Sequence, residues 1–157
     1  MRDAFRSLLG RCASGVVVVT TRGADGDHAM TSNSFTSLSL DPLLVLFCVQ
    51  RDSRFHTAIH AAERWVVNIL SAEQAPIARW FAERGRPLAG QMKVVEHTRD
   101  DDGIALLSGA IGHLTCTTEA IHPGGDHSIV VGRVRGIAHA DLQAKPLLYV
   151  NHRLGGL

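Results

Sequence analysis

Short apolar runs rich in β-branched residues recur along the chain, and turn-forming residues separate them. Val16 to Thr21, Leu43 to Val49 and Trp65 to Leu70 are apolar nearly throughout, which is typical of strands buried in a sheet. His127 to Ala140 is longer and carries apolar residues on both of its faces. These four segments are therefore predicted to be the main strands of the fold.

Weaker patterns predict additional strands. Asp25-Gly26 is a strong hairpin signal after the first strand, so the chain is expected to return as a strand from His28 to about Asn33. Ile104 to Ile121 is expected to form one or two strands, broken near Ser108-Gly109. The remaining predictions are a short strand at Gln91 to His97, an exposed turn at Arg99 to Gly103, a tight turn at Pro123 to Asp126 and a final edge strand at Lys145 to Val150.

Three other segments place apolar residues at helical spacing, each after a candidate capping residue. The expected caps and apolar faces are Asp3 with Phe5, Leu8, Leu9 and Cys12; Asp52 or Ser53 with Phe55, Ala58, Ile59 and Ala62; and Ser71 and Gln74, spaced as a capping box, with Ile77 and Phe81. The first helix is expected to run from Ala4 to Cys12.

Many strands joined by turns, with too few helices to alternate with them, predict a mainly β fold: an antiparallel β-barrel with a few peripheral helices. The chain has 157 residues, which suits one domain spanning 1–157. We find neither an internal repeat nor a linker.

Composition excludes several classes of function. The formal net charge is +1 and aromatic residues make up 5%, so neither a nucleic acid nor an anionic membrane is expected as partner. No apolar run is long enough to span a bilayer, and the first residues lack the apolar region of a signal peptide. Cys12, Cys48 and Cys116 are far apart and odd in number. They are interpreted as reduced core residues of a cytoplasmic protein.

The most informative stretch is Met30 to Pro42, in which Ser, Thr and Asn residues alternate with Phe35, Leu38 and Leu40. One interpretation is a polar loop between two strands. The interspersed apolar residues and the buried strand that follows indicate a segment that is partly buried instead. Buried hydroxyls need hydrogen-bond partners. A flavin, with its ring edge, ribityl chain and phosphate, offers such a set of partners.

Two further stretches add to this picture. Cys48 to Arg54 leads from a strand end into a helix N-terminus, where backbone N–H groups favour a phosphate and Arg51 and Ser53 could add contacts. Alternatively, it is an ordinary capped helix with surface arginines. Gly124 to His127 opens a strand with a histidine. The alternative there is a hairpin turn followed by an incidental His127.

Common catalytic and nucleotide-binding motifs are absent. The sequence has no Gly-x-Gly-x-x-Gly, Walker loop or Gly-x-Ser-x-Gly, and none of its nine histidines lies in a His-Glu-x-x-His or comparable pair. No metal site is predicted. Any nicotinamide nucleotide must therefore bind without a Rossmann unit, in a cleft of the same barrel.

Taken together, these stretches resemble the short-chain flavin reductases, the NAD(P)H:flavin oxidoreductases with a Greek-key split β-barrel that binds FMN. The resemblance runs nearly from end to end. Its matching segments are Phe5-Arg6 through Gly15 to Thr21, Met30 to Pro42, Cys48 to Arg54, Val67 to Leu70, Gly125 to His127 and Pro146 to Tyr149.

The resemblance implies roles for individual residues. His127 would be the catalytic residue, lying at the nicotinamide site. The cofactor-binding residues would be Thr31, Ser32, Asn33 and Ser34 along the ring and ribityl chain, Ser37, Leu38 and Ser39 at the pyrimidine edge, Arg51 and Ser53 at the phosphate, and their neighbours Cys48, Val49 and Arg54.

The resemblance also implies a reaction: NADH or NADPH delivers a hydride to bound FMN or FAD, and reduced flavin passes to a partner monooxygenase. The alternatives are a non-enzymatic flavin-binding module and a flavin-dependent oxidase of the pyridoxamine-phosphate-oxidase type. That oxidase would need a second Arg/Lys cluster, which the sequence does not reveal. We also expect a two-fold homodimer with the flavin close to the interface. A chain this short has little wall to spare for a flavin and a nicotinamide together, and the edge strand near Leu147 and the apolar helix faces at Phe5 and Phe81 need cover.

Overall fold

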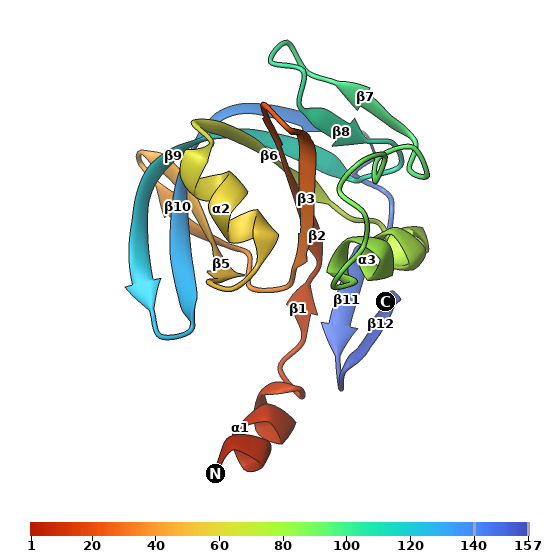
Figure 1. The fold of residues 1–157 in the computed structure, drawn as a ribbon. Coiled ribbons are helices and arrows are strands. Elements are labelled where there is room, and N and C mark those ends of the chain that lie inside the picture. Colours follow the sequence, from red (N-terminus) through yellow and green to blue (C-terminus); the bar gives the residue numbers. More distant parts are fainter. Residues whose placement is uncertain (140, 157) are drawn as a thin grey trace.

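A curled antiparallel sheet of seven strands dominates the molecule (Figure 1). The computed structural model describes residues 1–139 and 141–156. Every pairing in this sheet is antiparallel, which confirms the predicted mainly β fold with few helices. In spatial order its strands are β3 (Gly26–Ser32), β2 (Val17–Gly23), β6 (Arg64–Ile69), β9 (Gly112–Gly124), β10 (His127–His139), β5 (Leu43–Gln50) and β4 (Thr36–Leu40).

Smaller elements surround this sheet. The two smaller sheets consist of β1 (Ser14–Gly15), β11 (Leu147–Val150) and β12 (Arg153–Gly156), in the order β1-β11-β12, and of β7 (His97–Arg99) with β8 (Ala105–Leu107). The helices are α1 (Arg2–Leu9), α2 (Arg54–Ala61) and α3 (Ala75–Ala82), and a 3₁₀ turn, η1 (Ala72–Gln74), precedes α3. None of the helices in the described chain is long and apolar enough to cross a membrane.

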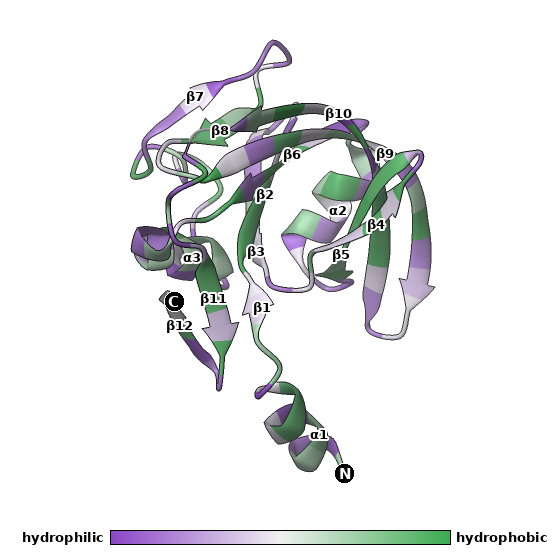
Figure 2. Cartoon of the chain, turned by 180° about the vertical axis from the view of Figure 1, so that it is seen from behind, coloured by the Kyte–Doolittle hydropathy of each residue, from purple (hydrophilic) through white to green (hydrophobic). Residues whose placement is uncertain are grey.

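Strand β2 has a core on each of its faces, which explains its unbroken apolar sequence. Val17 and Val19 point into the curl of the sheet, into an inner core to which α2 contributes Phe55 and Ile59. The alternate residues of β2 point the other way, into an outer core formed with α3, β8 and β11. Buried residues of this outer core include Val16, Val18, Phe81, Leu107 and Leu147. Figure 2 shows hydrophobic colour along β2 beside α2. The sheet therefore separates two apolar layers.

A large aromatic side chain fills the centre of the inner core. Trp65 is fully buried, meets Phe47 edge to face with ring centroids 5.2 Å apart, and donates its indole N–H to Thr118 Oγ1 at 3.1 Å. Gly132 on β10 faces this indole, and a Cβ built there would lie 2.2 Å from Trp65 Cζ2. The pairing of β10 with β9 shifts register between Val131 and Gly132. Only glycine leaves room for the indole at this point.

Most predicted elements are present, but several boundaries differ. The first helix is Arg2–Leu9 rather than Ala4 to Cys12, Asp3 is not its cap, and Cys12 is exposed rather than part of the core. Gln91 to His97 is not a strand, because residues 90–95 form turns and strand β7 begins at His97. The predicted edge strand, β11, lies between β1 and β12 and so is central in its sheet.

Candidate active site

The hydroxyl-rich segment, Met30 to Pro42, includes the end of β3 and all of β4. Its Ser34 links the end of β3 to β5, two strands that share no ladder. Ser34 Oγ accepts the Cys48 N–H at 2.9 Å and lies 3.0 Å from Ser32 Oγ. Thr31 donates its hydroxyl to the Ala78 carbonyl of α3 at 2.7 Å. These hydroxyls are already used in holding the backbone in place. Asn33 is exposed, which leaves its amide available to a ligand.

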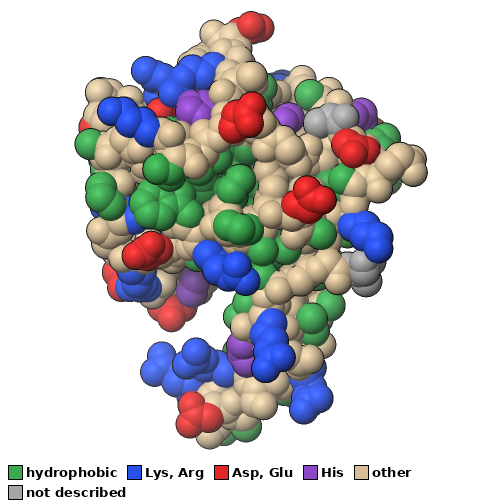
Figure 3. All heavy atoms as spheres, turned by 90° about the vertical axis from the view of Figure 1, so that its right-hand side faces the viewer, with side chains coloured by type: hydrophobic (Ala, Val, Ile, Leu, Met, Phe, Trp, Pro, Cys, Tyr) green, Lys and Arg blue, Asp and Glu red, His purple; other side chains and the backbone are tan. Residues whose placement is uncertain are grey.

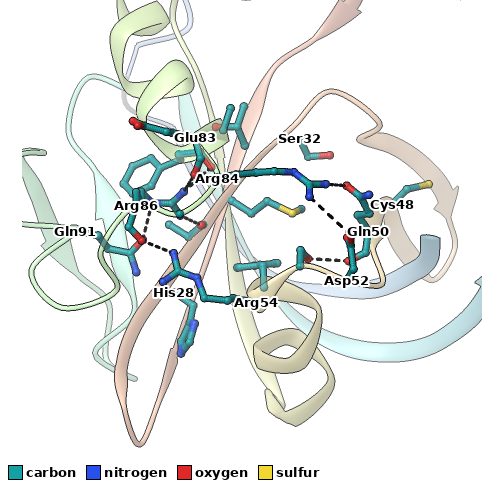
Figure 4. Close-up of a pocket in the computed structure, with 18 of the residues that line it drawn as sticks. His28, Ser32, Cys48, Gln50, Asp52, Arg54, Glu83, Arg84, Arg86 and Gln91 are labelled. Carbon is teal, nitrogen blue, oxygen red and sulfur yellow. Dashed lines mark hydrogen bonds and ion pairs between the residues drawn. The ribbon is translucent and has the colours of Figure 1, made fainter. Parts of the chain in front are cut away.

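This segment forms one wall of a cleft of about 620 Å³. The opposite walls are the end of β5, the N-terminus of α2 and the loop after α3 (Figure 4). The cleft brings together many of the residues singled out from the sequence. Those that line it are Thr31, Ser32, Asn33, Ser34, Cys48, Ser53, Arg54 and His127.

The other predicted residues lie outside this lining. Ser37, Leu38 and Ser39 belong to β4, at the end of the sheet, and Leu38 is 49% exposed. The side chain of Val49 is fully buried in the inner core. Arg51 is exposed, and its backbone N–H donates to the Asp126 carbonyl at 3.0 Å.

The N-terminus of α2 supplies anion-binding groups to the cleft. Ser53 is the N-cap: its hydroxyl accepts the His56 N–H at 3.1 Å and donates to the Gln50 carbonyl at 2.7 Å. The Ser53 hydroxyl is therefore occupied by capping. The first N–H groups of a helix lack intrahelical acceptors, and the positive end of the helix dipole lies there. Arg54 adds a guanidinium, which donates to the Arg86 carbonyl at 2.6 Å.

The loop after α3 contributes residues that no sequence pattern singled out. Arg84 extends to Gln50 and Asp52, as Figure 4 shows: it donates to Gln50 Oε1 and lies 3.7 Å from Asp52 Oδ2. Gln91 donates from Nε2 to the Asp27 carbonyl at 2.5 Å. All three contacts join residues far apart in sequence, so no local pattern reveals them. The only local signal is that Arg84 and Arg86 flank Gly85 in a polar loop.

Arg86 fastens this loop to the body of the protein. It is 8% exposed, and its guanidinium donates to the carbonyls of Ala29, Phe81 (3.0 Å) and Glu83 (3.1 Å) and to Gln91 Oε1 (3.0 Å). It also lies 5.2 Å from the centroid of the Phe81 ring. Burial, and then the nearby charge of Arg54, lower the pKa of Arg86 from its ordinary value. No carboxylate neutralises it within hydrogen-bonding distance among the described residues.

The cleft consequently has a cationic side. Arg54, Arg84 and Arg86 come together there, with Asp52 and Glu83 as the acidic residues of the lining. The sequence shows no second Arg/Lys cluster, because Arg54 and Arg84–Arg86 are separated along the chain. Arginines gathered beside a helix N-terminus form a site suited to a phosphate.

His127 lies at the first position of β10, opposite Gln50 of β5. Its Nδ1 is 2.7 Å from Asp126 Oδ1, and its side chain is 41% exposed. The hydrogen bond with His127 holds the pKa of the Asp126 carboxyl below its usual range. Asp126 therefore orients the imidazole, and the ring's other nitrogen is available at the cleft. Among residues 1–139 and 141–156, no group of three or more His, Cys, Asp or Glu side chains is arranged to bind a metal ion.

Comparison with known proteins assigns the family. Residues 9–157 match the model of the flavin reductase like domain. The chain is 39% identical over 148 residues to an NADH-dependent flavin reductase of a Rhodococcus species, covering 92% of this chain and 80% of that protein. It is 39% identical over 135 residues to an NADH-dependent FAD reductase of Streptomyces globisporus, covering 85% of this chain and 74% of the relative.

Solved structures give the same result. BorF, the flavin reductase component of a bacterial two-component tryptophan halogenase, superposes with a TM-score of 0.93 at 35% identity and covers 100% of this chain and 98% of its own. The Streptomyces globisporus NADH:FAD oxidoreductase SgcE6, solved with NAD and FAD fragments, gives 0.91 at 34% identity, covering 98% and 90%. With its family model, its relatives and its fold in agreement, the chain belongs to the flavin reductase like domain family.

Proposed function

We propose that this protein is an NAD(P)H-dependent flavin reductase that transfers a hydride from NADH or NADPH to FMN or FAD. The observation that carries the proposal is the shared cleft. It brings the hydroxyl-rich segment, the α2 N-terminus with Arg54, and His127 to one site. The curated relatives include enzymes named for FAD and for FMN, each using NADH.

The residues of the cleft fit a flavin nucleotide. The volume of the cleft, about 620 Å³, lies within the range of roughly 300–1,000 Å³ that is usual for small-molecule sites. The cationic side and the first turn of α2 suit the phosphate. Asn33 and the polar backbone around it suit the ring edge and ribityl chain. A bound flavin would supply the hydride-accepting ring, while the protein fixes its position and excludes water.

We propose the following division of roles. Thr31, Ser32 and Ser34 shape the wall along the flavin and leave Asn33 free to contact it. Ser53, as the cap of α2, positions the helix N-terminus. The remaining candidates are Arg54 at the phosphate, Cys48 beside the ring, and Ser37, Leu38, Ser39 and Val49, which would contact the flavin through backbone groups beyond the lining of the cleft. Arg51, which does not line the cleft, is the alternative phosphate contact.

His127 separates the enzyme from a non-enzymatic flavin-binding module. A module that only binds flavin has no need of an imidazole beside the cleft, whereas a reductase must align a nicotinamide with the flavin. The direct test mixes purified protein, NADH and FMN under nitrogen and follows loss of the reduced-nicotinamide absorbance. Flavin binding without NADH oxidation, at any tested NADH or NADPH concentration, would leave only the binding module.

The phosphate site can be tested with two neighbouring arginines. Because Arg54 lines the cleft and Arg51 does not, Arg54→Ala is expected to weaken FMN binding by roughly 1.5–3 kcal/mol, the strength of a hydrogen bond to a charged group. Arg51→Ala is the matched control and should change it little. Riboflavin, which lacks the phosphate, should be nearly indifferent to both. A larger loss from Arg51→Ala would move the phosphate to Arg51.

We further propose a homodimer with the flavin close to the interface. No residue of α1 is buried, and Phe5, Leu8 and Leu9 are 62%, 70% and 52% exposed. Figure 3 shows the end of the chain that carries this helix standing apart from the body of the molecule. A second copy would cover such an apolar arm. Light scattering should give twice the chain mass, and Leu8→Glu should shift it toward the monomer. A monomeric wild type at micromolar concentration would contradict the dimer.

We also propose that the reduced flavin serves a separate monooxygenase in the cytoplasm, and that residues 1–157 act as one domain. Some relatives are named as reductase subunits of flavin-dependent monooxygenases. The unpaired cysteines among the described residues suit a reducing compartment. Reduced flavin should therefore escape to an acceptor across a dialysis membrane. Retention of reduced flavin by the protein would argue against a diffusible product, and cell fractionation tests the compartment.

A further inference from the structure

A second cavity of about 420 Å³ lies between α2 and the hairpin that joins β2 to β3; we call it the α2 cavity. One wall is a face of the helix with small side chains, and the other is the tip of the hairpin. The residues that line it are Arg22, Gly23, Ala24, Asp25, His28, Arg54, Thr57, Ala58, Ala61, Ala62 and Leu88.

The α2 cavity adjoins the main cleft. His28, Arg54 and Leu88 line both. Arg54 is the first residue of α2, so the junction lies where the helix dipole and the guanidinium favour a phosphate. Figure 4 shows Arg54 and His28 together at this side of the cleft. The second cavity is therefore the nearest space for the rest of a ligand whose phosphate binds at the α2 N-terminus.

The lining of the α2 cavity suits a planar group that carries hydroxyls. Ala58 and Ala61 lie on α2 and Ala62 is its C-cap, and their small side chains leave room for a ring. Thr57 provides a hydroxyl, and Asp25 a carboxylate whose pKa is held below its usual range by the hydrogen bond from His28, 2.8 Å away. The carboxylate is therefore an acceptor for ribose hydroxyls or an amino group.

We propose that the α2 cavity receives the adenosine half of FAD, so that the chain distinguishes FAD from FMN by contacts beyond the first phosphate. This inference rests on the proposed flavin reductase function. FMN ends at one phosphate, whereas FAD continues through a second phosphate and a ribose to adenine. Arg54 at the junction and Arg22 at the far wall place a cation at each end of this path.

The proposal is tested with a variant in which a larger side chain blocks the α2 cavity. Ala61 is exposed at the last position of α2, so Ala61→Phe adds a ring to the cavity without changing the core. His60→Phe is the matched control, because His60 lies on the same helix, is exposed and lines neither cavity. Calorimetric titration of the apo-protein with FAD, FMN and ADP measures binding independently of turnover.

The expected result is a loss of tenfold or more in FAD and ADP affinity for Ala61→Phe, with FMN affinity unchanged within twofold. His60→Phe should leave all three unchanged. The KM for NADH, measured with FMN as acceptor, should be the same in both variants. FMN binding also shows that the variant is folded.

Three results would overturn the inference. They are equal losses of FMN and FAD, unchanged FAD affinity in Ala61→Phe, and a raised KM for NADH with FAD binding intact, which would give the cavity to the nicotinamide nucleotide. A wild-type chain that binds neither flavin would overturn the proposed function as well. A wild type that binds both flavins, with Ala61→Phe failing to separate them, would overturn the α2-cavity proposal alone.

Discussion

Replacing Arg86 by Met is expected to destabilise the fold by about 2–4 kcal/mol, although Arg86 lies in a loop outside the strands. The guanidinium donates to the carbonyls of Ala29, Phe81 and Glu83 and so joins β3, the end of α3 and the following loop. Met keeps an apolar stem of similar length but has no N–H group. The substitution therefore removes hydrogen bonds while filling most of the same space.

The magnitude follows from which carbonyls lose their partner. Ala29 and Phe81 are 3% and 2% exposed, so water cannot easily replace the guanidinium there, whereas Glu83 is exposed. Each buried acceptor left without a partner costs about 1–3 kcal/mol. Part of this loss is offset, because the variant no longer buries a cation that has no carboxylate beside it. The net estimate of about 2–4 kcal/mol is a large share of the roughly 5–15 kcal/mol that stabilises a domain.

Equilibrium unfolding in urea measures this change directly. At about 2–4 °C per kcal/mol for a chain of this size, the Tm should also fall by roughly 4–16 °C. Arg84→Met is the matched control, because its guanidinium is exposed and contacts only surface side chains. That variant should lose less than about 1 kcal/mol. If the two variants differ by less than about 0.5 kcal/mol, Arg86 does not hold the loop in the way the contacts indicate.

Three further outcomes are expected. His127→Ala should lower kcat/KM for NADH by about ten- to hundredfold at matched flavin saturation, whereas His122→Ala, an exposed histidine outside the cleft, should not; equal kinetics in stopped flow would remove His127 from the mechanism. Burial lowers the pKa of His113, so the unfolded chain binds its proton first and urea stability should fall as pH decreases through about 6.5; the His113→Gln variant should reduce that slope, and the part that remains is expected from His56, whose pKa burial also lowers. Burial raises the pKa of the Cys116 thiol to about 12, so a thiol reagent should modify exposed Cys12 quickly and Cys116 only in denaturant; rapid labelling of Cys116 in the native protein would contradict its burial.

Much of the sheet was predictable, because apolar runs and glycine turns are local signals. The runs at β2, β5 and β6 and the Asp25-Gly26 turn lie close to their predicted positions. Strand β4 was not predicted, since its hydroxyl side chains resemble a loop and it lies at the end of the sheet. Strand β12 contains glycines and pairs only with β11. In both cases the partner strand, rather than the segment's own sequence, stabilises the extended backbone.

The candidate active site also contains residues that a local sequence pattern predicts and residues that it does not. The residues of the hydroxyl-rich segment, of Cys48 to Arg54 and at His127 were found because each stretch is informative by itself. The loop after α3 was not. A strand was predicted at Gln91 to His97, yet the apolar residues Met92 and Val95 of this stretch join the outer core from turns. The side chains of Arg86 and Gln91 fix that path through contacts with β3, which a local pattern does not contain.

The close contact of Trp65 with Gly132 helps to fix the register of β10 in the sheet. If β10 shifted its register by one residue, a side chain would replace Gly132 opposite the indole and would clash with it. The observed register is therefore the one in which the inner core can pack. The two positions should consequently change together. Gly132→Ala alone would force apart the two sides of the sheet, whereas a smaller ring at position 65 would relieve the collision and partly restore folding. The pair offers a compact route for redesigning the interior without altering the cleft.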